Sequence, residues 1–161
     1  MTKFNFLKMM LLAVVMMVGS VAWGQTESIT ITRANFPSGA LAYGTDDLWT
    51  VTATDGSSIT GYFDLFSSET QTNMQTRTTT PIGSYPYNVV AIPGAISKIT
   101  LTGAGTGTAR AWTPYLSATA LTKSNYTSGI SQGAKTASTN SASTEWVVDP
   151  ASNFTYFYFS T

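Results

Sequence analysis

The chain of 161 residues contains no cysteine and no histidine, and only 10% of its residues are charged. The absence of cysteine excludes disulfides, thiol chemistry and zinc–thiolate sites. The absence of histidine removes the commonest general base and the commonest metal ligand. Eight basic and eight acidic residues give a formal net charge of zero, which provides no basic surface for nucleic acid or anionic membranes. The sequence therefore favours a protein that is not an enzyme and has no nucleic-acid partner.

Long apolar runs are also scarce, and the clearest one lies near the N-terminus. The run Met9–Val18 follows Lys3 and Lys8, and it is well short of the roughly twenty residues needed to span a bilayer. Small residues follow it, with Ala22 and Gly24 placed at positions −3 and −1 of a cut before Gln25. A basic start, a short apolar centre and a small-residue exit are typical of a secretory signal peptide.

We therefore expect residues 1–24 to be a cleaved signal peptide and residues 25–161 to be one secreted or cell-surface domain. Removal of the leader takes away Lys3 and Lys8, which leaves six basic against eight acidic residues and a formal charge of −2. No membrane attachment is expected after this removal. A domain of this length can bury a core without disulfides or metals.

The expected centre of this domain is the segment 87–102, in which two apolar runs flank a turn. Val89–Ile92 and Ile96–Leu101 lie on either side of Pro93-Gly94, a dipeptide typical of tight turns. In the second run Ile99 and Leu101 fall on one side, as in a half-buried strand. We expect two strands here, at the middle of a sheet.

The other expected strands share alternating β-branched or aromatic residues and end at turn residues. They are Ser28–Arg33, Leu48–Thr54, Ile59–Phe66, Thr108–Leu116, Thr144–Val148 and Phe154–Phe159. Asp55-Gly56 between two of them is a strong hairpin signal. Short strands around Met74 and near Tyr126 are weaker expectations. With no sustained helical period after the leader, the pattern predicts an all-β, antiparallel, two-sheet β-sandwich of jelly-roll type.

A family resemblance accompanies this pattern. Ser28-Ile-Thr-Ile-Thr followed by Asn35-Phe-Pro, the segment 87–102, Trp146 and Asn153-Phe-Thr-Tyr-Phe157 resemble secreted bacterial jelly-roll modules of the carbohydrate-binding-module-like kind. The resemblance implies a secreted, non-catalytic domain with a glycan or another cell-surface ligand as its partner. These motifs are structural, so the resemblance implies a fold more than a particular ligand.

The chain departs from that family at its end. The family usually continues after the Phe-Thr-Tyr-Phe strand into a final strand, whereas here the sequence stops at Thr161. Three explanations stay open: the domain lacks the final strand, a partner supplies that strand, or the sequence is a fragment of a longer chain. An unpaired aromatic strand at an edge would promote self-association through the C-terminal strand.

Aromatic residues supply the candidate binding site, because flat rings stack on the apolar face of a sugar. Tyr43, Tyr85, Tyr115 and Tyr126 lie at expected loops or strand ends and are the candidate ligand-binding residues. Trp49, Trp112 and Trp146 lie on expected strands, where packing in the core is the expected role.

The spacing of the acidic residues along the sequence indicates no pair that could act together in catalysis. Asp46 and Asp47 are candidate ligands of a structural calcium ion, since hard oxygens suit this cation; the alternative is a solvated turn before a strand. No other cofactor is expected.

Two functions stay open: a secreted module that binds carbohydrate or another surface ligand, and a structural or adhesive surface protein that assembles through an exposed sheet edge.

Overall fold

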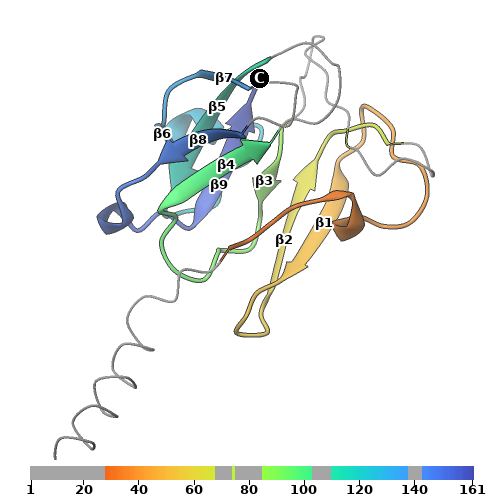
Figure 1. Cartoon of the computed structure of the whole chain (residues 1–161), viewed down its shortest axis with the longest axis horizontal. Helices are drawn as coiled ribbons and strands as arrows, with labels where there is room; N and C mark the ends of the chain where they lie inside the picture. The colour runs from red at the N-terminus through yellow and green to blue at the C-terminus, as the bar shows by residue number, and fades with distance from the viewer. Residues whose placement is uncertain (1–27, 68–73, 75–84, 103–109, 138–142) are drawn as a thin grey trace, which may run out of the picture.

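The computed structural model describes residues 28–67, 74, 85–102, 110–137 and 143–161 (Figure 1). The expected signal peptide lies outside the described residues. Within these ranges the chain is all-β, with antiparallel sheets and three short 3-10 helices: η1 (Arg33–Asn35), η2 (Tyr126–Ser128) and η3 (Pro150–Ser152). No helix in the described ranges is long and apolar enough to cross a membrane.

The larger sheet has the strand order β1-β2-β3-β9-β5-β6, and β7 also pairs with β5. Its strands are β1 (Asp47–Thr52), β2 (Ser58–Phe63), β3 (Tyr87–Asn88), β9 (Tyr156–Ser160), β5 (Arg110–Ser117), β6 (Ile130–Ser131) and β7 (Lys135–Ala137). The smaller sheet consists of β4 (Lys98–Thr102) and β8 (Ser143–Val147), and it lies in front of β5 and β9 in Figure 1.

The β1–β2 hairpin forms where the sequence predicts it. Gly56 has a φ of +84°, and the backbone N–H and the hydroxyl of Ser57 both donate to Asp55 Oδ1, at 2.8 and 2.6 Å. An acidic residue that bonds the backbone two positions on, followed by glycine in the left-handed region, is the expected chemistry of such a turn. The hairpin prediction at Asp55-Gly56 is confirmed.

The prediction of two strands at the middle of one sheet within residues 87–102 is only partly correct, because the two strands found there belong to different sheets. Only Tyr87 and Asn88 form a strand of the larger sheet, while Lys98–Thr102 pairs with β8 in the smaller one. The N–H groups of Val89 and Val90 both donate to Thr60 O, after which the chain leaves the sheet. Gly94, with a φ of +85°, lies in a connection between the two sheets and not in a turn between paired strands. The first apolar run thus begins beside the larger sheet, and the second one forms part of the smaller sheet.

Three other strand predictions also differ from the structure. Residues 28–32 form no strand and lead into η1, where Thr32 and Asn35 cap one another through their backbone and side-chain groups. Ile29 and Ile31 nevertheless pack against the core. Their two-residue spacing therefore indicates which side chains are buried, although the segment does not pair with another strand. The segment around Tyr126 is the 3-10 helix η2 and not a strand. Met74 also packs on the core without forming a strand.

The C-terminal strand is internal to the sheet. Tyr158 on β9 pairs with Tyr87 on β3 at one side and with Tyr115 on β5 at the other. The expectation of an unpaired aromatic edge at this strand is therefore wrong, and self-association through β9 would first have to break existing strand pairs. The reason is topological: β3 pairs with β2 on one side and with β9 on the other, so β9 lies between β3 and β5.

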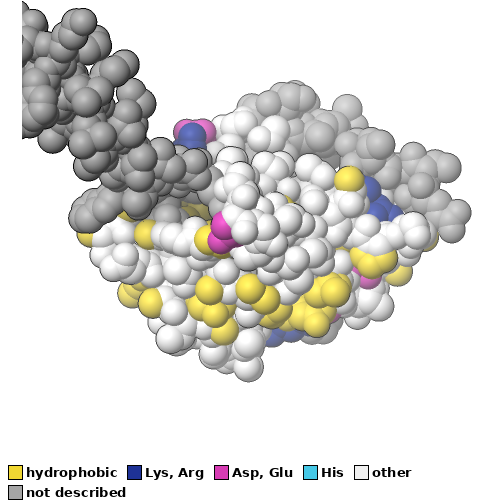
Figure 2. Space-filling model, turned by 90° about the horizontal axis from the view of Figure 1, so that it is seen from below, with side chains coloured by type: hydrophobic (Ala, Val, Ile, Leu, Met, Phe, Trp, Pro, Cys, Tyr) yellow, Lys and Arg dark blue, Asp and Glu magenta, His cyan; other side chains and the backbone are white. Residues whose placement is uncertain are grey.

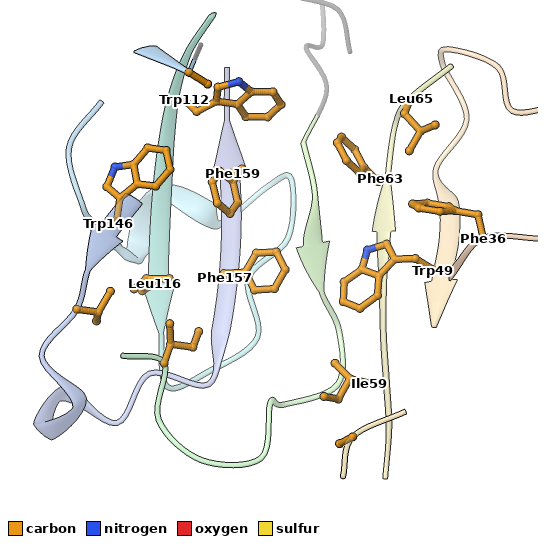
Figure 3. Close-up of a cluster of buried hydrophobic side chains, with 14 of the residues drawn as sticks. Phe36, Trp49, Ile59, Phe63, Leu65, Trp112, Leu116, Trp146, Phe157 and Phe159 are labelled. Carbon is orange, nitrogen blue, oxygen red and sulfur yellow. The ribbon is translucent and has the colours of Figure 1, made fainter. Parts of the chain in front are cut away.

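The main core lies on one face of the larger sheet, and the smaller sheet covers the part of it over β5 and β9 (Figure 1). Trp49, Trp112 and Trp146 are all buried in it, which confirms the packing role predicted for the tryptophans (Figure 3). Trp112 and Trp146 each meet Phe159 edge-on, with ring centroids 6.1 and 5.9 Å apart. Such aromatic pairs stabilise a core by about 0.5–1.5 kcal/mol beyond their buried area. These rings fix β8 against β5 and β9.

Candidate functional site

Four tyrosines form a continuous row across the face of the larger sheet that points away from the main core. In the strand register Tyr62 lies opposite Tyr87, Tyr87 opposite Tyr158, and Tyr158 opposite Tyr115. They come from the neighbouring strands β2, β3, β9 and β5. Because side chains alternate across a strand, the residues next to them, such as Phe63 on β2, point into the core. We call these four residues the tyrosine row.

Two further tyrosines pack on the row from outside the strands. The rings of Tyr85 and Tyr126 both stack on Tyr158, with centroid distances of 5.8 and 4.5 Å and interplanar angles of 7° and 11°. Tyr126 also meets Tyr115 edge-on at 5.1 Å. Leu121 completes this second hydrophobic cluster. We call the row together with Tyr85 and Tyr126 the tyrosine cluster.

A carboxylate and an ammonium group lie at the side of the cluster. The hydroxyl of Tyr85 donates to Asp46 Oδ1 at 2.8 Å, and Lys123 Nζ lies 2.6 Å from Asp46 Oδ2. The same ammonium group is 4.5 Å from the centroid of the Tyr85 ring. The two charges neutralise one another, and both keep part of their surface open to solvent. This ion pair therefore offers a hydrogen-bond donor and acceptor without adding a net charge of its own.

Burial changes the acid–base behaviour of the inner rings. Burial, followed by the hydrogen bond to Asp46, raises the pKa of Tyr85 far above its ordinary value near 10. Burial also raises the pKa of Tyr158 and that of Tyr87, with neighbouring tyrosines or Asp46 as smaller contributions. These phenols stay protonated at any physiological pH, so they act as hydrogen-bonding groups and not as bases.

The cluster is closed at its centre and accessible at its margins. Tyr85, Tyr87 and Tyr158 are buried, whereas Tyr62, Tyr115 and Tyr126 are only partly covered. Figure 2 shows one face of the molecule, on which charged side chains are sparse and hydrophobic ones form a band. A ligand would meet the outer rings first, with the buried ones as their support.

The structure brings together three of the four predicted tyrosines. Tyr85, Tyr115 and Tyr126 belong to the cluster, although Tyr85 is too buried to offer a free ring face. Tyr43 lies elsewhere, with its ring 5.7 Å from that of Phe66.

Sequence reasoning missed four members of the site: Tyr62, Tyr87, Tyr158 and Lys123. The signal for Tyr158 was present in Phe157-Tyr-Phe159, where a residue that alternates with two core phenylalanines must face the other side of the sheet. The same alternation applies to Tyr62, next to the buried Phe63. Nothing in the sequence connects Lys123 with Asp46, because that pair depends on the folded path of the chain.

The two candidate calcium ligands have different surroundings. Asp46 is engaged by Lys123 and Tyr85, as described above, while Asp47 is the first residue of β1. Burial, and next the nearby Asp64 carboxylate, raise the pKa of Asp47. Within the described ranges no three acidic, histidine or cysteine side chains gather where they could hold a metal ion.

Comparisons with known proteins found no matching family model, no matching curated protein and no matching solved structure.

Proposed function

We propose that this chain is a secreted, non-catalytic β-sandwich module of jelly-roll type that binds carbohydrate, or a similar polyhydroxylated surface ligand, on the tyrosine cluster. The observation that carries the proposal is the convergence of six tyrosines on one sheet face beside the Asp46–Lys123 pair. The two-layer packing of the smaller sheet on the larger one supports the sandwich, and the expected signal peptide supports secretion.

The chemistry of the cluster suits a sugar. The partly covered rings of Tyr62, Tyr115 and Tyr126 can stack on the C–H faces of pyranose rings, and their hydroxyls can donate to or accept from sugar hydroxyls. Asp46 and Lys123 add one acceptor and one donor at the margin. Because these charges cancel, the site favours a neutral ligand over a polyanion. A binding site of this kind needs neither a general base nor a metal.

Affinity electrophoresis on neutral soluble polysaccharides, together with a broad glycan array, tests this function. We expect the unsubstituted chain to be retained by at least one neutral polysaccharide. Tyr62→Ala and Tyr126→Ala should each weaken retention by about tenfold, since one stacked ring contributes on the order of 1–2 kcal/mol. Tyr43→Ala is the matched control, because this tyrosine lies outside the cluster, and it should be retained normally. Absence of retention on every polysaccharide and glycan would exclude the proposal.

Assembly through a sheet edge is the other function proposed from the sequence. Because β9 is internal, the outer strands of the larger sheet in the described ranges are β1 at one end and the two-residue β6 at the other, with β7 also on β5. Strand addition at so short a strand as β6 offers few hydrogen bonds. On β1, Asn35 Nδ2 donates to the carbonyl of Thr50 at 3.3 Å. Side chains that occupy the bonding groups of an edge strand work against strand addition. We therefore expect a monomer in size-exclusion chromatography with light scattering, and a defined oligomer would favour assembly instead.

A further inference from the structure

Residues 118–129 run from β5 to β6 across the tyrosine cluster, and we call them the strap. Its backbone hydrogen bonds are internal: Asn125 N and Tyr126 N donate to Thr122 O, Ser128 N donates to Asn125 O, and Gly129 N donates to Tyr126 O. Asn125 Oδ1 also accepts from the N–H of Thr122 at 2.6 Å. Across the ranges that the structure covers, no backbone–backbone hydrogen bond joins residues 118–128 to any strand.

Three side chains hold the strap on the sheet. Leu121 is buried in the cluster, with 1% of its surface exposed. Tyr126 stacks on Tyr158, and Lys123 pairs with Asp46. A segment with its own internal hydrogen bonds and only side-chain anchors can detach without breaking the sheet ladder, so its opening costs less than unfolding of the domain.

From these contacts we propose that the strap opens and closes as one unit, and that only its closed form assembles the binding site. The strap carries both the Tyr126 ring and the Lys123 ammonium group, and closure places them beside Tyr115 and Asp46. This role in binding rests on the function proposed above. A ligand that contacts Tyr126 would favour the closed form, because binding shifts the population toward the state it contacts. The strap thus regulates the site through its own closing equilibrium.

The absence of cysteine from the chain permits a direct test of opening. Leu121→Cys introduces a single thiol beneath the strap, and its rate of reaction with a soluble thiol reagent measures how often the strap opens. Leu116→Cys is the matched control in the main core, at a leucine that is 0% exposed. Ile130→Cys, at a side chain that is 58% exposed, gives the rate of a fully accessible thiol.

We expect the thiol at position 121 to react at least about tenfold faster than the thiol at position 116, and more slowly than that at position 130. Adding Lys123→Met should accelerate the reaction at position 121 about two- to fivefold, in line with the loss of one partly exposed ion pair. Position 116 should accelerate by no more than the same factor, because global unfolding breaks the same ion pair, and it should remain the slower of the two. Low urea should accelerate position 116 more steeply than position 121, because global unfolding exposes more surface than strap opening.

Equal rates at positions 121 and 116, with equal urea dependence, would overturn the proposal. If Leu121→Cys fails to fold, hydrogen exchange of the unsubstituted chain decides instead. Amides of residues 122–129 should then exchange faster than those of β5. Exchange of both groups of amides at the same rate would again overturn the proposal that the strap opens separately. Neither measurement needs a ligand, so a failure to bind polysaccharides would exclude the proposed function and leave the opening of the strap to stand or fall on its own.

Discussion

Trp49 lies directly opposite Gly61 in the register of β1 and β2, and its indole ring occupies the space above that glycine. A Cβ atom on Gly61 would come within 2.3 Å of the indole ring and within 2.0 Å of Tyr87 O. The absence of a side chain at Gly61 therefore lets Trp49 lie flat across β2 and stack on Phe157, with ring centroids 6.3 Å apart. It also lets β3 approach β2 closely enough to begin the tyrosine row.

We predict that Gly61→Ala destabilises the domain by about 3 kcal/mol or more. The added methyl group collides with a backbone oxygen as well as a ring, so no single rotamer change relieves it, and overpacking alone costs about 1–3 kcal/mol. Urea unfolding followed by tryptophan fluorescence measures the change. Thr52→Ala, at an exposed position on the same hairpin, is the control and should cost well under half as much. Equal stability of the two variants would contradict this account of Gly61.

A second prediction concerns Asn88, a fully buried polar residue at the end of β3. Its Nδ2 donates to the carbonyls of Val90 and Thr155 at 2.8 and 2.9 Å, and its Oδ1 accepts from Phe157 N at 2.7 Å. The side chain thus continues the pairing of β3 with β9 after the backbone ladder ends. Asn88→Ala removes all three hydrogen bonds of this buried side chain and should cost about 2–4 kcal/mol in the free energy of unfolding.

Asn88→Asp sharpens this test because it keeps the shape of the side chain. The carboxylate has no N–H groups for Val90 O and Thr155 O, and it adds a buried charge. We expect it to be at least as destabilising as Asn88→Ala at neutral pH and to recover stability on acidification, since protonation removes the charge. A variant as stable as the unsubstituted chain would show that the amide groups do not hold β9.

A third prediction follows from the raised pKa values of the inner tyrosines. An unfolded tyrosine ionises near pH 10, whereas burial raises the pKa of Tyr85, Tyr87 and Tyr158 above that value in the folded state. Their contribution to stability is therefore fully present below about pH 10 and is lost as the pH rises further, because the unfolded chain releases protons more readily.

Urea midpoints should accordingly stay flat between about pH 7 and pH 9 and fall steeply above about pH 10. Tyrosinate absorbance should show one group of phenols that ionises normally and another that ionises only as the domain unfolds. Tyr85→Phe should reduce the steepness of the fall. Ionisation of all the tyrosines near pH 10 without loss of structure would contradict the burial of the cluster.

A fourth prediction concerns calcium at Asp46 and Asp47. Because the Asp46 carboxylate is already engaged by Lys123 and Tyr85, a cation would have to displace the ammonium group. We expect thermal unfolding curves recorded with millimolar calcium and with a chelator to coincide. A rise of several degrees in calcium would reveal a site, since a ligand bound only to the folded state stabilises it. Loss of that rise in Asp47→Asn would assign it.

The sequence predicts the strands of this fold better than their partners. Alternation along Leu48–Thr54 and Thr144–Val148 reports which side chains are buried, and burial is a local pattern. The pairing of β4 with β8, or of β9 with both β3 and β5, joins segments far apart in the chain, and no periodicity encodes it. The two apolar runs that flank Pro93-Gly94 differ from the prediction for this reason: the chain does change direction there, but the second strand pairs with β8 in the smaller sheet.

The same distinction applies to the candidate site. Tyr85, Tyr115 and Tyr126 were predicted individually, because tyrosine in a loop or at a strand end suits recognition. Their convergence on Tyr158 depends on the register of β5 and β9 and on the path of the strap. The pairing of Lys123 with Asp46 has the same origin.

The central position of β9 governs when the sheet can form. Its partners β3 and β5 precede it by about seventy and about forty residues, so the pairs that join the two sides of the larger sheet close long loops. Domains dominated by such distant pairs fold slowly, because the entropy of loop closure is lost before the contacts are gained. Until residue 160 is available the two sides of the sheet have no common strand. The larger sheet can therefore be completed only after its last strand has been synthesised, although the β1–β2 hairpin needs no residue beyond β2.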